Sequence, residues 1–137
     1  MSALSDVVER KVLDHLFGGT AMTQYSSFKI AVGTSAWSDS AEGTEVTTNT
    51  GSGNYERQSI AFTAAATSSG TSKVANSAQI TFPAAPSNLG AIQYWAIYGT
   101  AGGTTEVVAH GQFSAARTIA TGDQLSIAQG ALEITAD

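Results

Sequence analysis

The stretch "LGAIQYWAIYGTAGGTTEVVAHGQFS", residues 89–114, decides the fold. Apolar side chains occupy both sets of alternating positions in its first half: Ile92, Tyr94, Ala96 and Tyr98 in one set, Ala91, Trp95 and Ile97 in the other. A period of two predicts a strand, and a strand that is apolar on both faces is central in its sheet or covered on its second face. The glycines of "GTAGG" predict a turn, so the second half returns as a hairpin partner.

The same period of two continues on both sides of this hairpin. It is found in "SFKIAVG" (27–33), "ERQSIAFTA" (56–64), "SAQITFP" (77–83) and "TGDQLSIAQGALEIT" (121–135), the last of which indicates two strands that meet at a tight bend. Small and polar residues at 34–54 and 64–73 predict loops. The chain therefore has about seven or eight strands. We expect a mostly β fold, with residues 20–137 forming one antiparallel β-sandwich or jelly-roll-like domain.

Residues 4–17, "LSDVVERKVLDHLF", show a helical period instead. Apolar side chains recur there every four residues and form one stripe: Leu4, Val8, Val12 and Leu16. Gly18 and Gly19 end the helix. Because so short an amphipathic helix is marginal by itself, its stripe must rest on the domain or on a neighbouring chain. We therefore assign residues 1–19 to attachment or oligomerisation.

Composition argues against several classes of partner. The net charge is −5 and the six Lys and Arg residues form no cluster, so we expect no nucleic-acid binding. No apolar run has the length of a membrane span, the N-terminus lacks the pattern of a signal peptide, and we expect no membrane partner. Only 12% of residues are charged, which is typical of a surface that other subunits partly cover.

Few residues suggest chemistry. The chain has no cysteine, and its two histidines, His15 and His110, have no nucleophile signature beside them. Three acids share the 34–53 loop at three-residue spacing: Asp39, Glu42 and Glu45. A solvated acidic loop explains them better than a weak calcium site, although the sequence leaves a ligand or an ion in this loop open. We predict no enzyme activity, no cofactor and no metal.

Aromatic residues offer one alternative function. Trp37 lies in a polar loop and Tyr55 follows it, so the two form a candidate surface on which a host-surface sugar would stack. The competing interpretation places such aromatic side chains in the core. A third possibility, hydrolysis of a cell-surface polymer, needs two converging ionisable groups near His110 or the acids of the loop.

An ordered set of motifs also carries a family resemblance. These motifs are "MSALSDVVERKVLDHLFGGTAMT" (1–23), "NYERQSIAF" (54–62), "AQITFPAA" (78–85), "LGAIQYWAIYGTAGG" (89–103) and "GQFSAARTIATGDQLSIAQGALEIT" (111–135). Together they resemble small virion proteins of tailed bacteriophages, described as tail-fibre-like or minor structural proteins, some of which decorate the capsid as cement proteins. The resemblance implies a non-enzymatic, β-rich protein of the virion, present in several copies.

The resemblance also implies partners and structural residues. The partners would be phage capsid or tail proteins and further copies of this chain, with a trimer favoured. Arg57 and Arg117 fall where the family tends to carry an arginine, and we interpret both as structural pins that bond main-chain carbonyls or an acid such as Asp123. Capsid decoration is the function that we expect first, and a tail-fibre or receptor-binding role is the alternative.

Overall fold

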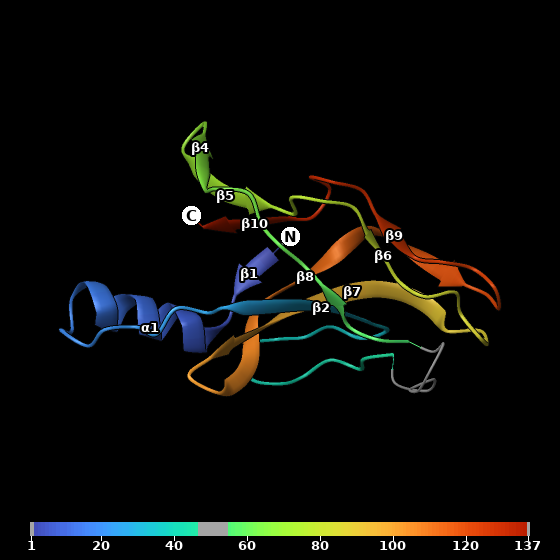
Figure 1. Ribbon diagram of the computed structural model, residues 1–137, viewed down its shortest axis with the longest axis horizontal. Helices are drawn as coiled ribbons and strands as arrows, with labels where there is room; N and C mark the ends of the chain where they lie inside the picture. The colour runs from blue at the N-terminus through green and yellow to red at the C-terminus, as the bar shows by residue number, and fades with distance from the viewer. Residues whose placement is uncertain (1, 47–54, 137) are drawn as a thin grey trace.

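The computed structural model describes residues 2–46 and 55–136 and shows two layers of antiparallel strands behind one N-terminal helix (Figure 1). The helix is α1 (Asp6–Leu16). The larger sheet has the order β1 (Ser2–Leu4), β8 (Thr104–Ile119), β7 (Gly90–Ala101), β2 (Ser27–Gly33), β3 (Gln58–Ser59). Two smaller sheets lie over it: β10 (Glu133–Ala136), β5 (Thr71–Ala75) and β4 (Ala66–Ser68) form one, and β6 (Ile80–Thr81) and β9 (Ser126–Ile127) form the other. The predicted fold class is confirmed.

The main core lies between the two layers. The larger sheet contributes Ile30, Val32 and Ile97, and the smaller sheets contribute Ile80, Ile127 and Ile134, all of which are buried. These residues point from each layer toward the other, and the alternate positions of β2 and β7 carry a second set of buried side chains on the opposite face. This burial is what holds the short strands β6 and β9 in place, because a two-stranded sheet is marginal alone.

The hairpin of β7 and β8, the two longest strands, forms the centre of the larger sheet. Ala101 pairs with Thr104 across a two-residue turn in which Gly102 and Gly103 both have positive φ, 57° and 82°. Such a turn needs left-handed backbone at both positions, which glycine adopts without steric cost. The turn predicted from "GTAGG" is therefore present.

The predicted faces of β7 need one correction. The pairing register shifts between Ile92 and Tyr94, because β8 contributes residues 113–116 without partners on β7. This irregularity breaks the alternation around Gln93, so Ile92 joins Trp95 in the main core rather than sharing the face of Ala96. The prediction of the two faces assumed an unbroken strand. A bulge leaves the apolar pattern of the sequence unchanged, so the sequence did not reveal it.

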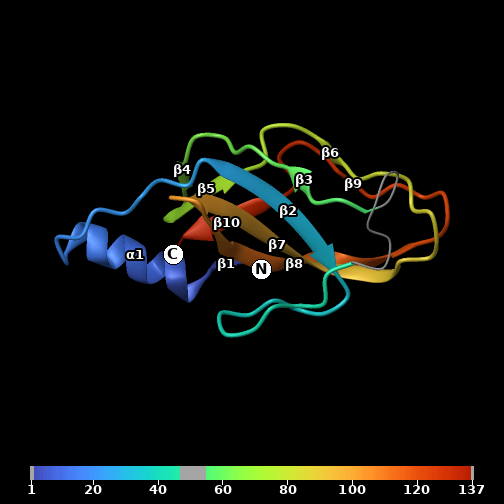
Figure 2. The ribbon, with the colours of Figure 1, turned by 60° about the horizontal axis from the view of Figure 1, so that its bottom comes forward.

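The second face of the larger sheet is covered by the segment 34–46. Figure 2 shows this segment running along the side of β2 and β7 away from the smaller sheets. Its Trp37 packs with Ala31, Ala96 and Tyr98 in a second, smaller core cluster. A strand apolar on both faces is central in its sheet or covered on its second face, and β7 is both, since it is the middle strand and this segment provides the cover.

Two local predictions were wrong. Leu4, expected in the helix, lies in strand β1 along β8. Residues 64–73 were expected to be a loop, but they include β4 and the start of β5, which pair as a hairpin. The two strands expected within residues 121–135 are present as β9 and β10 with a turn at Gly130 between them, and each pairs with a different strand, β6 and β5. Within the described ranges no helix has the length and apolarity that crossing a membrane requires.

Candidate interaction surface

Helix α1 is fixed to the domain at its N-terminal end. Ser5 stands at the N-cap, where its N–H donates to the Val108 carbonyl at 3.1 Å and its hydroxyl donates to the Val107 carbonyl at 2.7 Å. Val8 is buried and Val12 packs against the main core. The serine hydroxyl therefore joins the helix to β8 instead of capping the helix, and the first two turns rest on the sheet.

A polar cluster fixes the middle of the helix. Lys11 Nζ donates to Glu106 Oε1 and, at 3.1 Å, to the Tyr25 hydroxyl, which donates to the same Glu106 oxygen at 2.5 Å. The hydrogen bond with Glu106 raises the pKa of Lys11, and burial raises the pKa of Tyr25. Burial by itself raises the pKa of Glu106, but the bonds from Lys11 and Tyr25 outweigh it and the net pKa is lowered. The cluster thus favours the charged Lys11–Glu106 pair.

The far end of the helix is apolar and exposed. Leu13 is 58% exposed, Leu16 63% and Phe17 83%, and these are the exposed large hydrophobic side chains found in the part of the chain that the structure describes. Figure 1 shows this end of α1 projecting beyond the sheets. Three such side chains within five residues form an apolar surface at the helix tip, which we call the helix tip below.

The predicted four-residue stripe is therefore divided. Leu4 lies in β1, while Val8 and Val12 face the core, so Leu16 alone of the four lies in the helix tip. The sequence interpretation missed Phe17 as a surface residue. No local signal marks Phe17 as exposed, because its exposure depends on how far the sheet extends along the helix.

Trp37 does not form an exposed platform. Its side chain is only 4% exposed, and its indole N–H donates to the Tyr98 hydroxyl at 3.2 Å. A Cβ added at Gly33 or Gly43 would lie within 2.9 Å of the indole ring, so both glycines leave the space that the ring fills. The expectation that Trp37 offers a sugar-stacking face is wrong, because its polar loop folds back onto the sheet.

Tyr55 is also buried, and it belongs to a network around Glu45. The Tyr55 hydroxyl donates to Glu45 Oε1 at 2.8 Å and accepts the Val32 N–H at 3.1 Å. Arg57 holds both Glu45 oxygens, with Nε at 2.8 Å and a terminal nitrogen at 2.7 Å, and its guanidinium lies 3.7 Å from the centre of the Tyr98 ring. The bond to Glu45 raises the pKa of Arg57, and burial raises that of Tyr55. The proposed exposed role of Tyr55 is likewise wrong.

Arg57 thus forms an ion pair with an acidic residue, but that residue is Glu45 rather than Asp123. Asp123 Oδ2 instead accepts the Ala120 N–H at 3.1 Å inside its own turn. Arg117 donates to the Ser126 carbonyl at 3.3 Å and joins β8 to β9. All three residues make main-chain or ion-pair contacts, and their role as pins remains a prediction about stability.

The residues considered for chemistry do not gather at one site: His110 lies beside Asp39, whereas His15 contacts the main chain of another segment. His110 Nε2 lies 3.0 Å from Asp39 Oδ1, and His15 Nδ1 accepts the Met22 N–H at 3.2 Å. The described residues include no group of three His, Cys, Asp or Glu side chains arranged to hold a metal ion. A cleft of about 810 Å³ is lined by Arg117 and Glu133 among its charged residues, and His110 does not line it. Part of the 34–53 loop lies outside the described residues.

The comparison with protein families finds a match over most of the chain. The family model described as Podophage GP4 fiber I protein gp80 matches residues 3–135. The chain belongs to this family. A search of curated proteins finds no match.

Membership of the fiber I family decides the class of the protein. It is a structural, fibre-type protein of a phage particle, and its location is the virion. The resemblance to small tailed-phage virion proteins is confirmed. The fiber I family also makes other proteins of the particle the expected partners, and the family is one of structural rather than catalytic proteins.

Proposed function

We propose that the protein is a subunit of a particle-bound fibre and that the helix tip attaches it. The observation that carries this proposal is the exposure of Leu13, Leu16 and Phe17 at the end of a helix whose base is firmly fixed. Burying three such side chains against a partner contributes about 1.5–3 kcal/mol each. The fiber I family description supports a fibre-type structural role.

Capsid decoration is the second candidate. A small, sparsely charged domain with one apolar projection also suits a protein that binds a capsid surface in many copies. In both cases we propose self-association, most simply as a trimer, because several weak contacts that act together bind more firmly than one. A cryo-EM map of the particle distinguishes the two candidates by showing whether the chain lies on the tail or on the head.

Attachment is tested with particles that lack this protein. Purified wild-type protein should bind to them, and a Leu16→Asp/Phe17→Asp variant should bind at least about tenfold more weakly, since a charge in an apolar contact costs more than 1.4 kcal/mol. Glu9→Ala, on an exposed helix position away from the tip, is the matched control. The exposed positions leave the fold intact, which circular dichroism checks. Equal binding of variant and wild type overturns the proposal.

Deleting residues 1–17 is a poor version of this test. The deletion removes β1 and the buried Val8 together with the tip. A loss of binding would then reflect a damaged domain as much as a lost contact.

A further inference from the structure

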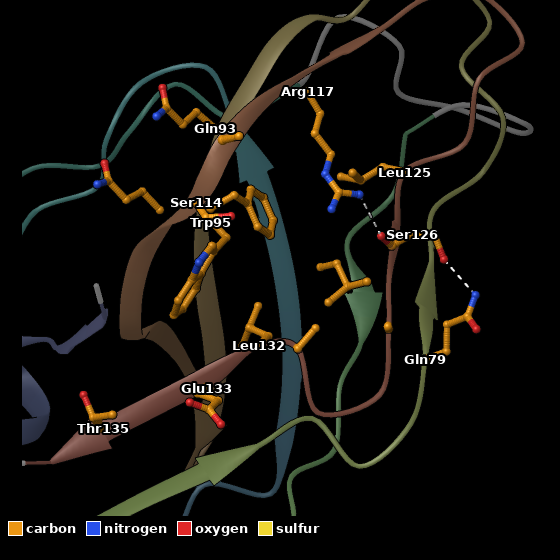
Figure 3. A pocket seen from close by; sticks show the side chains of 16 residues that line it. Gln79, Gln93, Trp95, Ser114, Arg117, Leu125, Ser126, Leu132, Glu133 and Thr135 are labelled. Carbon is orange, nitrogen blue, oxygen red and sulfur yellow. Dashed lines mark hydrogen bonds between the residues drawn. The ribbon is translucent and has the colours of Figure 1, made fainter. Parts of the chain in front are cut away.

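The cleft between β8 and β9 is the second notable surface of the molecule. Figure 3 shows it from close by, with Arg117 and Ser114 on one wall, Ser126 on the other and Leu132 near one end. Its volume of about 810 Å³ is within the range of about 300–1,000 Å³ that is usual for binding sites. It lies on the side of the larger sheet that faces the smaller sheets, away from the helix tip.

The walls of this cleft are formed by the edges of strands. Residues 112–115 of β8 line it consecutively, and so do residues 125–128 around β9. Successive side chains of a strand point to opposite faces. A consecutive lining therefore means that the strand turns its edge, with the main-chain N–H and carbonyl groups, toward the cleft.

These edges lack strand partners. Residues 113–116 have no register partner on β7, and β1 pairs with β8 only at residues 109–111. On the other wall, β9 pairs with β6 and with no second strand among the described residues. Unpaired strand edges are the usual template for the addition of another strand.

The two walls of the cleft are not paired with each other. Paired strands lie about 4.8 Å apart and bond through their main chains. The Arg117 guanidinium donates a hydrogen bond across this cleft to the Ser126 carbonyl at 3.3 Å. The contact between the two walls is therefore made by a long side chain and not by paired main chains. β8 and β9 are thus too far apart to pair directly.

The position proposed for the added strand continues the line of β1, and an incoming strand would displace the Arg117 side chain from the Ser126 carbonyl. Ser2 of β1 pairs with Gly111, and the cleft begins at Gln112 on the same strand of the larger sheet. β1 shows that β8 accepts an antiparallel partner up to this point. A second strand placed beyond β1 would extend an existing interface rather than create a new one.

We propose that the cleft receives an extended polypeptide segment from a neighbouring protein of the particle, which adds as a strand between β8 and β9. Its alternate side chains are apolar and meet the accessible apolar lining at Phe113, Ala128 and Ala131, while the others meet Gln79 and Gln112 at the rim. This surface is separate from the helix tip. The inference rests on the virion location of the chain and not on how the chain is attached.

A sugar fits the cleft less well. Stacking needs an open aromatic face, and Trp95, which lines the cleft, is only 4% exposed. A strand, in contrast, uses the main-chain groups that the two walls present. Main-chain pairing is also the feature by which the experiment separates the two kinds of ligand.

The test compares free protein with assembled particles by hydrogen–deuterium exchange. We expect the amides of residues 113–116 to exchange at least about tenfold more slowly in the particle, whereas the exposed tip of the β4–β5 hairpin, residues 69–70, is unchanged. The absence of cysteine allows a second measurement on the same particles. The thiol of Ser114→Cys should react with maleimide at least about tenfold more slowly in the particle, and Ala65→Cys is the exposed control.

Each outcome decides the proposal. Protection of both the amides and the thiol supports strand addition. A protected thiol with unchanged amide exchange overturns it and favours a sugar or another side-chain ligand, and unchanged values for both overturn it outright. Because protection is measured per bound copy, a failure of the helix tip to attach the protein would change the number of copies and not this result.

Discussion

The indole N–H of Trp37 donates to the hydroxyl of Tyr98 at 3.2 Å, and this bond joins the segment 34–46 to strand β7. Both side chains are buried, although Trp37 lies in a stretch of Ser, Thr, Gly and acidic residues. The segment 34–46 of this fibre protein therefore contributes to its folded core.

Replacing Trp37 tests that conclusion. We expect Trp37→Ala to lower the free energy of unfolding by about 3–5 kcal/mol, the usual cost of removing a buried large aromatic side chain. Trp37→Phe should cost less, because it keeps a six-membered aromatic ring, although it loses the pyrrole half of the indole and one hydrogen bond of about 1 kcal/mol. Urea unfolding followed by far-UV circular dichroism measures both. A Trp37→Ala variant as stable as the wild type would contradict the burial of this residue.

The space around the indole ring gives a second prediction. A Cβ at Gly43 would lie 2.5 Å from the Ser35 carbonyl oxygen and 2.8 Å from the Trp37 ring. Gly43→Ala should therefore displace the ring and destabilise the protein by about 1–3 kcal/mol. The near-UV circular dichroism of tryptophan should change with it. Ser40→Ala, at an exposed position of the same loop, is the control and should leave both readouts unchanged.

The Arg57–Glu45 pair is suited to a double-mutant cycle. Both Glu45 oxygens are held by the guanidinium, and the carboxylate is largely buried. Arg57→Ala should cost about 1.5–3 kcal/mol, because it leaves a desolvated carboxylate with fewer donors. Glu45→Gln should cost part of the same energy, and the double variant should be less unstable than the sum of the single ones. Additive effects would show that Arg57 does not act through Glu45.

The stability of the helix anchor should fall in acid. Folding lowers the pKa of Glu106 below its ordinary value of 4.5, so the folded protein binds fewer protons there than the unfolded chain. The contribution of Glu106 is fully present above about pH 4.5 and is lost as the pH falls through the lowered pKa. Glu106→Gln should therefore flatten the acid side of the unfolding free energy measured against pH. An unchanged acid slope would contradict the role of the cluster.

The same cluster also affects how the free energy of unfolding depends on pH in alkaline solution. Folding raises the pKa of Lys11 above 10.5, so its contribution is complete below that pH and is lost as the pH rises through the raised pKa. In a Tyr25→Phe background, which removes the other group of the cluster that titrates at high pH, Lys11→Met should flatten the alkaline side while leaving Val8 and Val12 packed. Lys73→Met serves as the control, because Lys73 forms an ion pair with Glu133 that is exposed on both sides.

Elements were predicted correctly from the sequence where the pattern that indicates them lies within a few consecutive residues. The alternation of residues 90–101 and the glycine turn that follows predicted the central hairpin, since both signals act within a few residues. The base of the helix was predicted for the same reason. Low charge and the absence of a catalytic signature predicted a structural protein, and the family comparison agrees.

The remaining features depend on contacts between distant residues. Leu4 matches a helical stripe, but main-chain pairing with Ala109 places it in β1. Trp37 is buried because Gly33 and Tyr98 provide its space and its acceptor, and no local pattern records that. The exposure of Phe17 depends in turn on where the sheet ends.

The two tryptophans of the chain lie in different clusters on opposite sides of the same sheet, Trp95 in the main core and Trp37 in the second cluster. Their fluorescence therefore provides two intrinsic probes of folding, one for each cluster. Variants that keep one of them and replace the other by phenylalanine would reveal whether the covering segment detaches before the two layers separate, or whether the whole domain opens in a single step.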